Sequence, residues 1–164
     1  LLDCIEIETA PDPRRSIIWL HGLGADGNDF APIVPEIDLE GLAVRYVFPH
    51  APMQPVTING GMMMRAWYDI SDQAIRREDA KGVTASRGHV EALIARERAR
   101  GVEPSRIVIA GFSQGGAISL YAGLRHERRL AFLRGTTGRN RAAITATSIA
   151  GGGPPAAPGA PGAD

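Results

Sequence analysis

The run Ile107-Val108-Ile109-Ala110-Gly111-Phe112-Ser113-Gln114-Gly115-Gly116 decides the fold of this 164-residue chain. Its four leading apolar residues predict a strand that is buried on both faces of a sheet. An apolar stretch from Ala117 to Leu124 follows and predicts a helix. Between them lies Gly-x-Ser-x-Gly, whose small residues permit a sharp turn that lifts the serine hydroxyl above the sheet. We therefore predict that Ser113 is a nucleophile; the alternative is an ordinary strand-to-helix turn.

Strands and helices alternate on the N-terminal side of this run. Three further strands are predicted, at residues 5–7, 16–20 and 43–48. The first alternates apolar and acidic residues, which is typical of a half-exposed strand near an edge. The sequence thus predicts an α/β fold with a mostly parallel sheet flanked by helices.

Two helices are predicted between these strands. Apolar residues at helical spacing indicate a short helix over residues 30–37, shortened or kinked by Pro35. A longer helix is predicted to begin near Ser86 and to end at Gly101. Residues 49–66 hold five prolines and glycines, which predicts a long loop without regular structure.

A second glycine-rich loop, residues 22–27, follows the strand at residues 16–20. Its Gly-x-Gly-x-x-Gly spacing matches a dinucleotide-binding fingerprint, which also requires an acidic residue at the end of the next strand. That strand ends Val47-Phe48-Pro49-His50 and offers no carboxylate. The competing interpretation is an oxyanion loop, whose backbone N–H acts together with the N–H that follows the nucleophile. We favour the oxyanion loop and keep a nucleotide-binding domain as the alternative.

Three motifs in sequence order resemble one branch of the α/β-hydrolases, the carboxylesterase/acyl-protein thioesterase family. They are Ile17-Ile18-Trp19-Leu20-His21-Gly22-Leu23-Gly24-Ala25-Asp26, then Pro55-Val56-Thr57-Ile58-Asn59-Gly60-Gly61 with Trp67-Tyr68-Asp69, and lastly Gly111-Phe112-Ser113-Gln114-Gly115-Gly116. The resemblance covers residues 1–131, which we take as an incomplete hydrolase domain.

The resemblance implies a serine hydrolase of carboxylic esters, lysophospholipids or acyl thioesters. It implies Ser113 as the nucleophile and the backbone N–H groups of Leu23 and Gln114 as oxyanion donors. It also implies that the 62–67 region, including Met64 and Trp67, lines the acyl pocket, although these residues could equally be packing residues.

Composition limits the partners of such an enzyme. The chain carries 18 basic and 18 acidic side chains, so no charge excess points to nucleic acid. No apolar run is long enough to span a bilayer. The single cysteine, Cys4, excludes an intrachain disulfide and a cysteine metal cluster. We expect a cytoplasmic enzyme that acts on a small-molecule ester or thioester without metal or other cofactor; a homodimer is left open.

The sequence departs from the family in its triad, which runs serine, aspartate, histidine along the chain. The one histidine after Ser113 is His126, about 20 Å along a continuous helix. The other three, His21, His50 and His89, precede the nucleophile and would contradict the family order. No triad aspartate or histidine is therefore identifiable.

The C-terminal segment, residues 132–164, is rich in Gly, Ala, Pro and Arg, and 14 of its last 15 residues are Gly, Ala or Pro. It predicts a disordered tail, produced by a shifted reading frame near codon 132 or present as a natural linker. We expect an impaired esterase, or alternatively a catalytically dead hydrolase remnant. Loss of the following strands would leave residues 107–110 as an unpaired apolar edge and make the protein poorly soluble.

Overall fold

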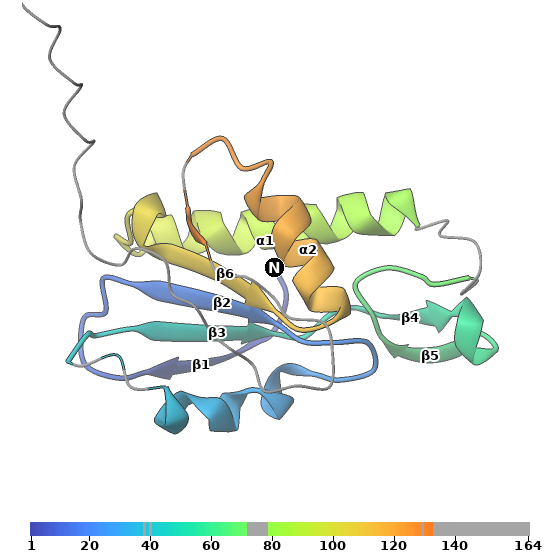
Figure 1. Cartoon of the computed structure of the whole chain (residues 1–164), viewed down its shortest axis with the longest axis horizontal. Coiled ribbons are helices and arrows are strands. Elements are labelled where there is room, and N and C mark those ends of the chain that lie inside the picture. The colour runs from blue at the N-terminus through green and yellow to red at the C-terminus, as the bar shows by residue number, and fades with distance from the viewer. Residues whose placement is uncertain (38, 40, 72–78, 129, 133–164) are drawn as a thin grey trace, which may run out of the picture.

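The computed structural model describes residues 1–132 except 38, 40, 72–78 and 129, and Figure 1 shows its five-stranded sheet. The strand order is β1-β3-β2-β6-β7. Only β1 runs antiparallel to its neighbour; the other pairs are parallel. This confirms the predicted α/β fold with a mostly parallel sheet. The strands are β1 (Cys4–Glu8), β2 (Ser16–Leu20), β3 (Arg45–Pro49), β6 (Ile107–Gly111) and β7 (Ala131–Phe132).

The centre of the sheet is β2, which pairs with β3 on one side and β6 on the other. Ile17 lies opposite Tyr46 of β3 and Val108 of β6. Every residue of these three strands is buried, as expected of parallel strands covered on both faces. Strand β1 is half-exposed at the edge, so the predictions for residues 5–7 and 107–110 are both confirmed.

Helices cover both faces of the sheet (Figure 1). Side chains of one parity, such as Ile18 and Ile109, pack with α1 (Ala80–Ala99) and α2 (Gln114–Gly123). Side chains of the other parity, such as Trp19 and Phe48, pack beneath two 3₁₀ helices, η1 (Gly27–Asp29) and η2 (Ala31–Glu36). Because successive side chains of a strand point to opposite faces of the sheet, each strand contributes to two separate hydrophobic cores.

The helix predictions need two corrections. Residues 31–36 form a 3₁₀ helix rather than an α-helix, because Pro35 has no N–H to continue an α-helical ladder. Helix α1 begins at Ala80, before the predicted start near Ser86. Its N-cap is Asp79, whose carboxylate accepts from the Gly82 N–H at 2.9 Å.

The prediction of an irregular loop over residues 49–66 was wrong. The segment contains a two-stranded antiparallel ribbon, β4 (Met53–Val56) and β5 (Met62–Arg65), joined by the 3₁₀ helix η3 (Thr57–Asn59). Gly60 and Gly61, with φ of 67° and 78°, return the chain. Pro55 is tolerated because both strands of a two-stranded ribbon are edge strands. In Figure 1 the ribbon extends beyond one end of the main sheet.

The C-terminal edge of the sheet also differs from expectation. After the 3₁₀ helix η4 (Pro104–Arg106) and strand β6, the chain crosses through α2 and adds β7 beside β6. Val108 lies opposite Ala131, so the run at residues 107–110 is partly paired rather than an open edge. The predicted domain boundary falls inside β7, and residues 133–164 of the predicted tail lie outside the described residues.

A buried carboxylate joins α1 to the sheet. The side chain of Glu97 is fully buried, and its Oε2 accepts from Nη1 of Arg45 on β3 at 3.0 Å. Oε1 pairs with Arg96 at 3.4 Å and with Arg100 at 3.2 Å. Arg45 also binds Glu8 of the edge strand at 2.8 Å. The pairs therefore connect β1, β3 and the C-terminal turn of α1.

Removing this carboxylate should be costly, because it leaves a nearly buried arginine without its partner. We expect Glu97→Ala to lower the free energy of unfolding by about 3–5 kcal/mol in urea titrations. The matched control is the exposed Glu103, whose replacement by alanine should change it by less than about 0.5 kcal/mol. Equal effects of the two substitutions would contradict this role for Glu97.

Candidate active site

Ser113 occupies a strained turn between β6 and α2. Its backbone has φ 52° and ψ −117°, a region that residues with a side chain rarely adopt. The residue is exposed and precedes the first residue of α2, yet its hydroxyl makes no capping bond to the helix. The side chain is thus presented to solvent at the positive end of a ten-residue helix.

The glycines around Ser113 are required by contacts with the backbone. A Cβ on Gly111 would lie 2.3 Å from the carbonyl oxygen of Gly115. A Cβ on Gly115 would lie 2.3 Å and 2.4 Å from the carbonyl oxygens of Leu20 and His21. The spacing Gly-x-Ser-x-Gly therefore has the mechanical basis that the sequence analysis gave it: the helix enters against the end of β2.

The glycine-rich loop after β2 lies beside this turn. A Cβ on Gly22 would be 3.6 Å from the Cβ of Ser113 and 3.2 Å from the ring of Phe112. The Gly24 N–H donates to the carbonyl of Arg65 on β5 at 2.9 Å. Within the described residues, the N–H groups of Leu23 and Gln114 donate no hydrogen bond. Each glycine-rich motif thus carries one backbone N–H that has no acceptor among the described residues.

The same loop lacks the helix that a dinucleotide site needs. Asp26 caps η1: its Oδ1 accepts from the Asn28 N–H at 2.7 Å, while its own N–H donates to Asp29 at 2.7 Å. The three-residue η1 that follows is a 3₁₀ turn, not the α-helix N-terminus that holds a pyrophosphate. This geometry weighs against the nucleotide-binding alternative.

The side chain of Gln114 reaches a third segment, which the sequence analysis missed. Its Oε1 accepts from the Trp67 N–H and its Nε2 donates to the Tyr68 carbonyl, each at 2.7 Å. Gln114 is almost completely buried. A long polar residue directly after the nucleophile was the available signal, because a buried amide at the start of an apolar helix requires partners.

His21 is buried and structural. The Ala51 N–H donates to its Nε2 at 2.9 Å, so its Nδ1 carries the proton and donates to the Gly22 carbonyl at 2.7 Å. Burial lowers the pKa of the His21 imidazole below its ordinary value and outweighs the opposing effect of the Gly22 hydrogen bond. A neutral ring with both nitrogens occupied is not available as a base for Ser113.

The two predicted pocket residues lie in different surroundings. Trp67 is 1% exposed, and its ring lies 5.4 Å from that of His21 in the core, which fits the packing alternative. Met64 on β5 is partly exposed, and its sulfur accepts from Asn59 Nδ2 at 3.3 Å. That sulfur would lie 3.9 Å from a Cβ on Gly24. Met64 is therefore beside the loop that carries Leu23.

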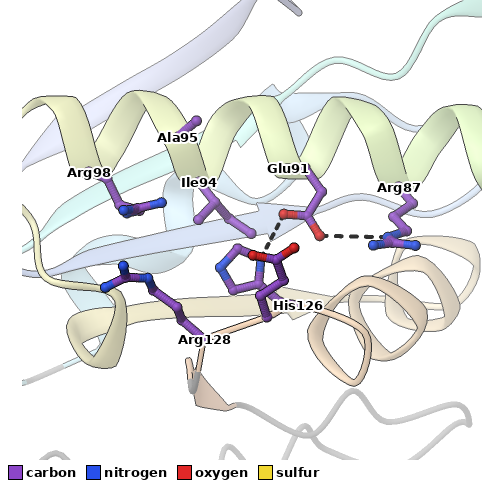
Figure 2. A pocket seen from close by; sticks show the side chains of 8 residues that line it. Arg87, Glu91, Ile94, Ala95, Arg98, His126 and Arg128 are labelled. Carbon is purple, nitrogen blue, oxygen red and sulfur yellow. Dashed lines mark hydrogen bonds and ion pairs between the residues drawn. The ribbon is translucent and has the colours of Figure 1, made fainter.

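The remaining histidines have other neighbours. His50 accepts from the Gly27 N–H at 3.1 Å, and His89 lies on α1. His126 binds Glu91 of α1 through Nδ1 at 2.6 Å, as Figure 2 shows. His126 and Glu91 line a cavity of about 340 Å³ that includes none of the predicted site residues. Across the described residues, no side chain hydrogen-bonds to the Ser113 hydroxyl.

Known proteins resemble this chain in sequence and in fold. The sequence model of the phospholipase/carboxylesterase family matches residues 2–151. The chain belongs to this family. The match continues past residue 131, where the resemblance ends in the sequence analysis. The fold is that of the α/β-hydrolases.

Individual family relatives are acyl-protein thioesterases. Acyl-protein thioesterase 1 of Schizosaccharomyces pombe is 44% identical over 138 residues, which are 84% of this chain and 61% of the relative. The same-named protein of Emericella nidulans is 38% identical over 125 residues, 70% of this chain and 52% of that protein. This chain thus spans little more than half the length of the curated relatives that it matches.

Solved structures of other proteins have a similar fold over much of this chain. SOBER1 of Arabidopsis thaliana superposes with a TM-score of 0.67 at 36% identity, over 71% of this chain and 58% of that one. Acyl-protein thioesterase 2 of Zea mays gives a TM-score of 0.62 at 28% identity, over 75% and 51%.

No three His, Cys, Asp or Glu side chains gather around a metal-sized space in the described part of this family member. None of the helices there is long and apolar enough to cross a bilayer.

The turn at residues 111–115, which we call the elbow, predicts opposite outcomes for two glycine-to-alanine changes, one in α2 and one in α1. Gly115→Ala should lower the free energy of unfolding by about 3 kcal/mol or more, because its Cβ meets two backbone oxygens that cannot move aside. Gly88→Ala in α1, where a Cβ meets nothing within 4 Å, should raise it by about 0.5–1 kcal/mol. Urea titration measures both; a stable Gly115→Ala protein would contradict the close approach.

The buried His21 predicts a pH dependence of stability. Because its pKa is lowered by folding, the unfolded chain takes up the proton first as the pH falls below about 6.5. The free energy of unfolding should therefore decrease as the pH falls from about 6.5 to the folded pKa. Above about pH 6.5, His21 should contribute no pH dependence. NMR titration of the imidazole checks this, and His21→Gln should lose this part of the dependence. Titration of His21 at or above the ordinary value would contradict it.

Proposed function

We propose that this chain carries the nucleophile half of a serine hydrolase that cleaves carboxylic esters or acyl thioesters through an acyl-enzyme on Ser113. The single observation that carries the proposal is the exposed Ser113 at φ 52°, with a hydroxyl that no described residue binds. An ordinary strand-to-helix turn gives no reason for a non-glycine residue in this conformation. Strain of this kind is concentrated at functional sites.

The reaction is an acyl transfer in two steps. The Ser113 oxygen attacks the carbonyl carbon, a base takes the hydroxyl proton, and the alcohol or thiol leaves with a proton. Water then attacks the acyl-serine, releases the carboxylic acid and restores the hydroxyl. The N–H groups of Leu23 and Gln114, which have no acceptor among the described residues, are the proposed donors to the oxyanion. Their effect is strengthened by the positive end of α2.

We propose that the chain's own histidines do not supply the base. His21 and His126 are held by other partners, His50 binds the η1 turn and His89 lies on α1. We therefore propose that the 164-residue chain by itself turns over slowly. Loss of a triad member in serine hydrolases costs on the order of 10⁶ in turnover, with a residual rate from oxyanion donors and binding.

The substrate class follows from the family and from one local feature. The relatives are acyl-protein thioesterases, and an acyl group bonded to oxygen or sulfur presents the same carbonyl to Ser113. Met64, beside the Gly24 turn, is the proposed contact for the acyl chain. A thioether fills an irregular apolar space well. We propose no cofactor and no nucleic-acid partner; action in the cytoplasm and a homodimer stay predictions.

Chemical rescue tests the proposal with the chain as it stands. Free imidazole at pH 8 should replace the missing base and accelerate hydrolysis of a p-nitrophenyl acyl ester. We expect the wild-type rate to rise linearly with imidazole to about tenfold or more above that of Ser113→Ala. The Ser113→Ala protein supplies the correction for direct attack of imidazole on the ester.

The outcomes are distinct. Equal rates for wild type and Ser113→Ala at every imidazole concentration would exclude Ser113 as the nucleophile. Fast turnover without imidazole that is lost in Ser113→Ala would retain the nucleophile but overturn the proposal that the chain lacks a base.

A further inference from the structure

We propose that the side chain of Gln114 is a positioning residue that fixes both oxyanion donors relative to Ser113. This inference rests on the proposed function of Ser113. It assigns a role to the buried side-chain amide of Gln114, beside the role of its backbone N–H as an oxyanion donor. The role follows from a chain of hydrogen bonds that begins at Gln114 and ends at the peptide before Leu23.

The first link joins the elbow to the segment after β5. The side chain of Gln114 hydrogen-bonds to two consecutive residues. Its Oε1 accepts from the Trp67 N–H and its Nε2 donates to the Tyr68 carbonyl, both at 2.7 Å. In one of these bonds the Gln114 side chain is the acceptor, and in the other it is the donor. A single buried amide therefore sets both the position and the orientation of the backbone at these two residues.

The second link joins Trp67 to the glycine-rich loop. The indole N–H of Trp67 donates to the carbonyl of His21 at 2.9 Å. The peptide that contributes this carbonyl is followed directly by Gly22 and Leu23. The backbone of Trp67 is also bonded to α1, because the Ser86 hydroxyl donates to the Trp67 carbonyl. All three polar groups of Trp67 are thus occupied, each by a different segment.

The third link holds the ring of His21. Its Nε2 accepts from the Ala51 N–H and its Nδ1 donates to the Gly22 carbonyl. The Gly22 peptide that contains this carbonyl also contains the Leu23 N–H. Orientation of the carbonyl therefore fixes the direction of the N–H, because the peptide group is planar. The network ends on one of the two proposed donors and begins on the residue that supplies the other.

This arrangement matters because oxyanion donors act by preorganisation. They contribute most when they already point to the place where charge develops, in a site that does not rearrange. The loop between β2 and η1 contains two glycines, Gly22 and Gly24, and has no regular structure of its own. The buried hydrogen bonds from Gln114 and Trp67 supply the rigidity that its sequence does not.

The test uses three variants of the full chain. Gln114→Met keeps the volume and the backbone N–H but removes both side-chain hydrogen bonds, and Trp67→Phe keeps a ring but removes the bond to His21. Ser119→Ala is the matched control, because Ser119 is equally buried in α2 and, among the described residues, its hydroxyl bonds only the Gly115 carbonyl, at 2.8 Å.

The first readout is independent of activity. Amide exchange by NMR should show the Ala51 and Gly24 N–H groups, which are bonded in the wild-type protein, exchanging about tenfold faster in Gln114→Met and Trp67→Phe. Ser119→Ala should leave both rates unchanged. Trp67→Phe keeps the test open if Gln114→Met fails to fold.

The second readout is the imidazole-dependent ester hydrolysis. Displacing a donor acts on the transition state, so kcat should fall about tenfold or more with KM within about twofold, in both network variants but not in the control. Unchanged exchange and unchanged kcat in an active protein would overturn the inference. If wild type itself shows no Ser113-dependent rate, the proposed function fails, and amide exchange alone decides the coupling.

Discussion

The contact between the first turn of α2 and the end of β2 is the constraint on which the site depends. Gly115 lies so close to the carbonyl oxygens of Leu20 and His21 that no Cβ fits. Because α2 enters there, the chain must reverse within two residues after β6, and Ser113 takes the strained conformation that exposes its hydroxyl. The same contact brings the peptide of His21, and the glycines after it, next to the nucleophile. One steric condition thus produces both the elbow and its neighbouring loop.

The strain at Ser113 is held by apolar packing below it and by buried polar contacts beside it. Beneath the elbow, β6 and β2 are buried along their whole length, which makes the sheet a rigid base. Beside the elbow, the amide of Gln114, the indole of Trp67 and the ring of His21 each hydrogen-bond to backbone groups of another segment or of the adjoining loop. Buried polar groups of this kind are costly unless paired. Their pairing therefore favours one arrangement of three loops that are far apart in sequence.

Local features of the sequence predicted the central elements. Continuous apolar runs gave β2 and β6, alternation gave β1, and the spacing of Gly111, Ser113 and Gly115 gave the turn, since all of these depend on neighbours along the chain. The predictions of secondary structure were wrong where the structure of a segment depends on distant contacts, on a capping side chain or on proline. The ribbon β4–β5 forms although it contains Pro55, because both of its strands are edges. Helix α1 extends to Asp79 because that side chain caps it, and the helix predicted at residues 30–37 is a 3₁₀ helix because of its prolines.

The sequence by itself determined that this is an α/β chain of the phospholipase/carboxylesterase family with Ser113 at its elbow. A strand, a glycine-flanked serine and an apolar helix in succession encode that turn through local sterics. Only the tertiary structure decided which polar groups meet around it. It buried His21 with both ring nitrogens hydrogen-bonded, placed Trp67 in the core, and paired His126 with Glu91 rather than with the serine. Those outcomes depend on contacts between residues up to 47 positions apart, and no local pattern encodes such distances.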